Sequence, residues 1–200
     1  MSDDTIRSLE RRARQGDYDA LVSWLVERVK HGLLTQERLE AAAVLKSPEA
    51  RDACRRLGVK LGSGEGEVLN SVPMVEIGIV PLEAEEVFDL FLTVCRHVVS
   101  TSPGLAKRHF SKARIALAEH RIAQVENLGL EEIRELVSAW LEDTDFIFRI
   151  AFYTFFTNFG YVSQEVAVGI TDAIAYNTPF AERRPVYEWL RNTLISTLLG

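Results

Sequence analysis

The side chains best suited to catalysis or metal binding are histidines and cysteines, and their spacing indicates no shared site. The histidines are His31, His97, His109 and His120, and the cysteines are Cys54 and Cys95. No two histidines have the i, i+4 spacing that aims two imidazoles of one helix at a metal ion, and H-E-x-x-H does not occur. Cys95 and His97 are two positions apart, which turns them away from each other on a helix, and only a long-range pairing stays open. The sequence predicts no catalytic residue, no metal site and no cofactor.

Two further features lack the neighbours that chemistry would need. Residues 62–66 read GSGEG, but a phosphate-binding loop needs a lysine and a hydroxyl residue at fixed offsets after a strand. Glu65 and Glu67 would also repel a phosphate, so we expect a flexible linker here. Cys54 and Cys95 form no C-x-x-C or Cys/His pattern, and both are predicted to be buried free thiols.

The composition is that of a folded, soluble and acidic chain. Its 200 residues fit one domain, and a hydrophobic share of 47% is enough for a core. The formal net charge of -6 at pH 7 argues against a general nucleic-acid binder, which normally has a basic surface. Residues 1–12 lack the basic-then-apolar order of a secretory signal, and no run approaches the roughly 18 apolar residues of a spanning helix. We therefore expect a cytoplasmic protein that does not enter a membrane.

Positive charge gathers on two predicted helices, at 6–14 and 104–124. On the first helix the arginines are spaced i, i+4, i+7, which places them on one face, opposite the apolar side chains. The basic residues are Arg7, Arg11 and Arg14 on the first helix, and Lys107, Arg108, Lys112 and Arg114 on the second. Each face could be merely solvated and partly balanced by the acidic stretch 83–89, or it could bind an acidic protein or an anionic polymer.

An aromatic segment at 143–162 places six of the ten phenylalanines within the fourteen positions from Phe146 to Phe159. A helix over 145–158 would be apolar nearly all round, as in a protein core or a membrane. Fourteen residues extend only about 20 Å, which is short of the roughly 30 Å hydrocarbon layer, so we expect a central core helix. An alternative is a small-molecule pocket beside this helix. Its lining would include Arg149, Phe152, Tyr153, Phe156 and Asn158.

The spacing of apolar residues by three and four along most of the chain predicts an all-α fold. We expect a multi-helix orthogonal or antiparallel array in which an N-terminal pair of helical hairpins packs on a larger helical body. Capping residues divide the hairpins: Thr5, Asp17, Thr35 and Ser47 open helices, and Gly16, Gly32 and Gly58 end them. The other predicted helices lie near 83–100, 104–124, 130–142, 145–158, 164–176 and 186–199.

The domain organisation predicted from these signals is a single compact unit with three parts. Residues 1–58 form the N-terminal hairpins, 59–82 form a crossover rich in glycine and proline, and 83–200 form the main body. Val75, Ile77 and Ile79 alternate with other residues, which would suit one short extended segment, but a lone strand has no visible partner. We therefore expect an ordered crossover.

An internal similarity appears when TIRSLERRARQGDYDA (5–20) is aligned with TQERLEAAAVLKSPEA (35–50), because Thr, Leu, Glu and two Ala coincide. Residues 5–58 resemble tetratricopeptide-related helical hairpins and the N-terminal helical modules of uncharacterised bacterial proteins. They lack the Trp-Leu-Gly-Tyr pattern of true tetratricopeptide repeats. The resemblance implies a helical-hairpin fold used for protein binding, and it implies no site residues. The alternative is that any two alanine-rich amphipathic helices would align equally well.

Three functional hypotheses follow from the sequence. The first is a non-enzymatic, cytoplasmic helical protein that recognises another protein, as an adaptor, a regulator or an immunity-like partner of a toxin. The second is a small-molecule-binding protein or enzyme whose pocket lies beside the aromatic helix. The third is a homo-oligomeric scaffold, because one sequence does not separate an intramolecular apolar stripe from a dimer interface.

Overall fold

The computed structural model describes residues 3–61, 72–83, 163–178 and 183–200, together with several single positions. Those positions are Glu86, Val87, Asp89, Leu90, Thr93, Val94, His97 and Phe180. All regular structure in the described residues is helical, so the predicted all-α fold class is confirmed. The helices are α1 (Asp3–Arg14), α2 (Tyr18–Lys30), α3 (Gln36–Val44), α4 (Pro48–Leu57), α5 (Val72–Ile79), α11 (Ser163–Asn177) and α12 (Arg183–Leu199).

The starts of α2, α3 and α4 are set by the capping residues that the sequence predicted, whereas Thr5, the fourth predicted capping residue, lies inside α1, which begins at Asp3. The side chains of Asp17, Thr35 and Ser47 each accept a hydrogen bond from the main-chain N–H three residues later, at 3.0, 3.3 and 3.2 Å. These bonds satisfy donors that have no partner within the helix. Gly58 ends α4 in the left-handed conformation, with φ +74°, which costs glycine little.

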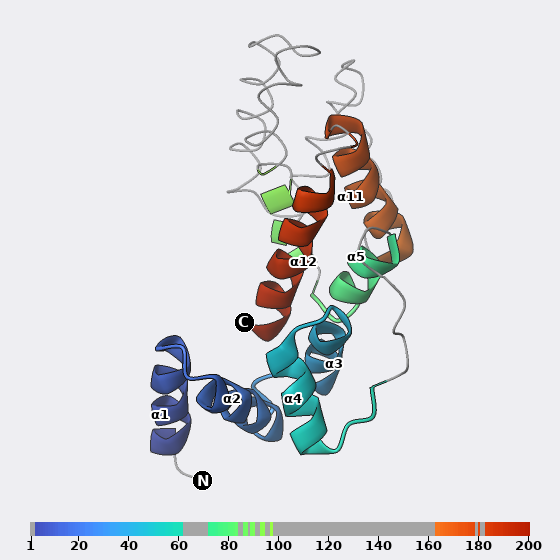
Figure 1. Cartoon of the computed structure of the whole chain (residues 1–200). Helices are drawn as coiled ribbons and strands as arrows, with labels where there is room; N and C mark the ends of the chain where they lie inside the picture. The colour runs from blue at the N-terminus through green and yellow to red at the C-terminus, as the bar shows by residue number, and fades with distance from the viewer. Residues whose placement is uncertain are drawn as a thin grey trace, which may run out of the picture.

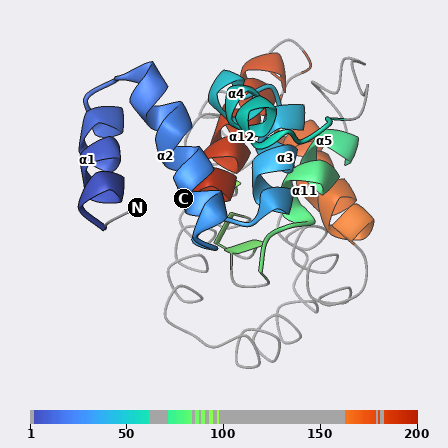
Figure 2. The same ribbon diagram turned by 90° about the horizontal axis from the view of Figure 1, so that it is seen from below.

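The N-terminal hairpins pack on a helical body, as predicted. α1 packs against α2, and α3 packs against α4. α2 also contacts α4, while α3 contacts α12 and α5. Figures 1 and 2 show α12 beside α11, α5 and α3, whereas α1 lies at the outer edge with α2 as its neighbour. The two hairpins therefore have different surroundings, since α3 is part of the body and α1 projects from it.

The core is one apolar cluster to which every helix from α2 onward in the described residues contributes. Leu190, Leu194 and Leu198 recur every fourth residue along α12, and all three are fully buried. Burial of a leucine side chain stabilises the fold by roughly 1.5–3 kcal/mol. At Gly78 in α5 an added Cβ would lie 2.7 Å from a Cδ atom of Leu194, so the absence of a side chain lets the two helices approach closely.

The stretch 72–79, within the predicted crossover, is a helix, α5, and the extended segment considered for Val75, Ile77 and Ile79 is not formed. The buried residues of α5 are Met74, Val75, Gly78 and Ile79, a pattern with the helical spacing of three to four. A short apolar run suits a buried helix and a buried strand equally well, so its neighbours decide. Here the neighbours are the helices α11, α12 and α3, and none of these offers a strand for pairing.

Arg38 on α3 holds the turn that follows α5. Its Nε donates to the carbonyl oxygen of Pro81 at 3.1 Å, and its two terminal nitrogens donate to the carboxylate of Glu86, Nη1 at 2.9 Å. The main-chain N–H of Glu83 donates to the same carboxylate at 2.9 Å. Burial alone would raise the pKa of Glu86, but the hydrogen bonds from Glu83 and Arg38 outweigh it, so this pKa lies below its usual 4.5.

This carboxylate should contribute to the pH dependence of stability. A depressed pKa in the folded state means that the stabilisation is present above the unfolded-state pKa and is lost as pH falls through the folded-state value. We expect Glu86→Gln to be less stable than the wild type at pH 6, with the difference shrinking toward zero as the pH falls below 4.5 and through the folded-state pKa of Glu86. Urea unfolding from pH 6 to pH 3 measures this difference, and a gap that stays constant with pH would contradict the assignment.

Within the described ranges, every helix is too short or too polar to cross a membrane. The predicted helices at 104–124, 130–142 and 145–158 lie outside the described residues, and 83–100 lies there in part.

Candidate functional site

Helix α1 is amphipathic, and the arginines of its charged face are exposed. Ile6, Leu9 and Ala13 are half-buried on the side opposite the arginines. The helix ends at Arg14, and Gly16 takes the left-handed conformation, with φ +86°, that turns the chain into α2. α1 is thereby held through one face and its other side remains open to solvent.

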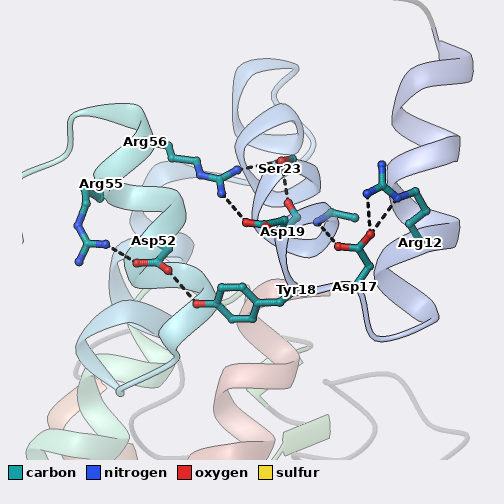
Figure 3. A network of polar contacts seen from close by, with 9 residues as sticks. Arg12, Asp17, Tyr18, Asp19, Ser23, Asp52, Arg55 and Arg56 are labelled. Atoms are coloured by element: carbon teal, nitrogen blue, oxygen red, sulfur yellow. Dashed lines mark hydrogen bonds and ion pairs between the residues drawn. The ribbon is translucent and has the colours of Figure 1, made fainter.

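The junction between α1 and α2 is fixed by an ion pair (Figure 3). The Nε and Nη2 atoms of Arg12 donate to Oδ2 of Asp17 at 2.9 and 2.6 Å, while Oδ1 accepts the N–H of Ala20 at 3.0 Å. The Ala20 hydrogen bond and then the Arg12 bond hold the pKa of Asp17 below its ordinary value. The guanidinium group of Arg12 is therefore already paired within the chain, where it links the end of α1 to the start of α2.

A second set of polar contacts joins α2 to α4 (Figure 3). The hydroxyl of Tyr18 donates to Asp52 at 2.9 Å. Arg56 donates to Asp19 at 3.0 Å and to Ser23 at 2.9 Å. These groups are exposed, so each contact adds little stability. They nevertheless show that Arg56, Asp19 and Asp52 are paired within the chain.

The three arginines predicted on the first helix differ in their surroundings. Arg7, Arg11 and Arg14 are all exposed, as the spacing predicted. Arg14 donates to Glu10 at 2.6 Å, one turn away. Among the residues that the structure describes, Arg7 and Arg11 have no hydrogen bond or ion pair. These two guanidinium groups, which we call the α1 basic face, can therefore bind another molecule without breaking an internal contact.

The other predicted site residues lie outside the described part of the chain. These are Lys107, Arg108, Lys112 and Arg114 of the second basic helix, and Arg149, Phe152, Tyr153, Phe156 and Asn158 beside the aromatic segment. The GSGEG stretch at 62–66 also lies outside it.

The side chains of Cys54 and His97 both pack against other parts of the fold. Cys54 is fully buried, as predicted, and burial raises the pKa of its thiol to about 11, which keeps it protonated and unreactive. His97 stacks on Trp189 with ring centroids 3.6 Å apart, and burial lowers the pKa of its imidazole. No group of three or more His, Cys, Asp or Glu residues in the described ranges could hold a metal ion.

A pocket that the sequence did not indicate lies where the end of α12 meets the turn after α2 and the turn after α5. It has a volume of about 430 Å³, and its lining includes Arg28, Leu33, Arg38, Val80 and Gly200. These residues come from three distant parts of the chain, so no local motif could reveal it.

Comparisons with known proteins give no family for this chain: no protein-family model, no curated protein and no solved structure matches it. The resemblance of residues 5–58 to helical hairpins therefore stays a prediction.

Proposed function

We propose that this chain is a non-enzymatic, cytoplasmic adaptor or regulatory protein in which the α1 basic face binds an acidic surface of another protein. One observation carries the proposal: Arg7 and Arg11 are exposed and have no partner among the residues that the structure describes, although Arg12 and Arg14 of the same helix are both paired. A helix that projects from the body can present these groups to a partner with little steric hindrance (Figure 1).

The spacing of the two arginines suits carboxylates on a protein surface. Residues four apart on a helix are separated by about 6 Å along its axis and lie on one face. A guanidinium group binds a carboxylate through two parallel hydrogen bonds, which adds geometric selectivity to the charge attraction. Such exposed pairs mainly accelerate association and select the partner, and their effect falls as salt is added.

A protein partner fits this surface better than nucleic acid does. Binding to a nucleic acid backbone normally needs many phosphate contacts, whereas this face offers two arginines that are unpaired within the described part of a chain of net charge -6. A partner with a few clustered aspartate or glutamate residues could be bound by two arginines, while the acidic remainder of the chain would repel a polyanion.

The proposal is tested by affinity purification of the tagged chain from its own cells at low salt. We expect a partner that is retained by the wild type and lost by the double variant Arg7→Glu, Arg11→Glu. The matched control is Lys60→Glu, Arg184→Glu, which makes the same change in net charge at exposed positions elsewhere. A partner that both double variants retain equally, or that both lose, would contradict the assignment of the α1 basic face.

A further inference from the structure

The pocket between α12, the turn after α2 and the turn after α5 has an apolar rim above a charged wall. Leu33 and Val80 are 60% and 62% exposed at this rim. The volume of about 430 Å³ lies within the range of small-molecule sites. The rim therefore offers apolar contact area that a ligand could cover.

The charged wall contains Arg28, and only some of the N–H donors of its guanidinium group make hydrogen bonds to described residues. Its Nη1 atom donates to the main-chain oxygens of Leu199 and Gly200, and its Nη2 atom makes a long contact of 3.5 Å with the oxygen of Leu33. The group also stacks over the ring of Trp24 at 4.5 Å. Among the described residues, no side-chain carboxylate lies within ion-pair distance of it.

The unused donors of Arg28 lie along one edge of the group. A guanidinium group has five N–H donors, and the contacts with Leu199, Gly200 and Leu33 use the two on Nη1 and one on Nη2. The remaining donors, on Nε and Nη2, form the edge that binds a carboxylate through two parallel hydrogen bonds. Nε has no hydrogen-bond partner among the described residues, and the one contact of Nη2 on this edge, with Leu33, is long.

The second arginine of the pocket limits the charge that a ligand can carry. Arg38 is already paired with Glu86, and Glu37 and Glu83 also line the pocket. Arg28 can balance one negative charge, and because Arg38 is already paired, a second charge on the ligand would be left without a partner beside Glu37 and Glu83. The pocket chemistry therefore favours a monoanion with an apolar body.

We propose that this pocket binds a small aliphatic or aromatic monocarboxylate, with the carboxylate on the Nε–Nη2 edge of Arg28 and the apolar body against Leu33 and Val80. The site is separate from the α1 basic face, and neither proposal depends on the other. The ligand class is defined by its chemistry: one carboxylate and a small apolar body that fits the pocket.

The test is titration of the ¹⁵N-labelled full chain with hexanoate, with hexanamide and inorganic phosphate as matched probes. We expect saturable amide shifts centred on 32–35 and 80–82 with hexanoate, and at least tenfold weaker binding of hexanamide, which keeps the body and lacks the charge. Equal binding of the two probes, preferential binding of phosphate, or shifts centred elsewhere would overturn the proposal.

Two variants separate the charge from the apolar rim. Arg28→Met should reduce hexanoate affinity at least tenfold and leave the weak hexanamide binding unchanged, with unfolding temperature measured as a check on the end of α12. Val80→Ser changes an exposed side chain, so the fold is retained, and it should weaken both probes by a similar factor. Hexanoate binding that survives both substitutions would refute this location even if Arg28→Met were destabilised.

Discussion

Replacing Leu194 by alanine should lower the free energy of unfolding by about 3 kcal/mol, within the usual 2–5 kcal/mol for a buried leucine. The side chain is fully buried in α12, where this helix packs against α3 and α5. Truncation would remove its apolar contacts and leave a cavity at the centre of the core. For a chain of this length, the corresponding decrease in melting temperature is roughly 6–12 °C.

Urea unfolding followed by circular dichroism gives the free-energy difference. The control is Asn192→Ala in the same helix, because Asn192 is exposed and its replacement should change stability by less than about 0.5 kcal/mol. If Leu194→Ala were as stable as this control, α12 would not be packed in the core as described.

The contact between Leu194 and Gly78 adds a stricter version of the same test. Gly78→Ala should cost about 1–3 kcal/mol, because the new methyl group would meet Leu194 at 2.7 Å inside a packed interface. The double variant should lose less than the sum of the two, since the shorter side chain at 194 leaves room for the methyl group. Simple additivity would show that α5 and α12 do not approach closely at this point.

The second large effect concerns binding. Arg7→Glu, Arg11→Glu should lower the affinity for the partner by on the order of 100-fold, because the substitutions turn two attractive contacts with acidic groups into repulsive ones. The fold should be unaffected, since neither arginine has a described internal contact and exposed substitutions of this kind usually change stability by less than about 0.5 kcal/mol. Surface plasmon resonance with the purified partner measures the affinity.

Salt provides an independent check on the electrostatic origin of this loss. Raising the NaCl concentration from 0.05 to 0.5 M should weaken binding of the wild type, mainly by slowing association. Binding of Lys60→Glu, Arg184→Glu should show the same salt dependence as the wild type. An affinity that salt does not change would mean that apolar contacts, and not the arginines, hold the partner.

Much of the described fold could be predicted from sequence because its signals are local. Asp17, Thr35 and Ser47 cap the helices that they were expected to open, and the capping bond spans only three residues. α5 was missed because a short apolar run is ambiguous until its neighbours are known. α12 begins at Arg183, three residues before its predicted start, and helix ends are the least certain part of such predictions.

Of the two candidate sites, the sequence could predict the α1 basic face but not the pocket. Exposure of Arg7 and Arg11 follows from helical spacing, and pairing of Arg14 with Glu10 follows the i, i+4 rule that the sequence already contains. The pocket could not be predicted, because Arg28, Leu33 and Val80 meet only through tertiary packing. The predicted sites at 107–114 and 149–158 lie outside the described residues and stay predictions.

Site-specific photo-cross-linking in cells tests most directly whether the α1 basic face binds a protein. A photoreactive amino acid at Ser8, an exposed residue between Arg7 and Arg11 in sequence, should give one discrete adduct with an acidic segment of the partner. The same amino acid at Ser196, an exposed serine of α12, should give none, and Arg7→Glu, Arg11→Glu should abolish the Ser8 adduct. An adduct that forms equally from Ser196, or that persists after both arginines are reversed, would contradict binding through this face.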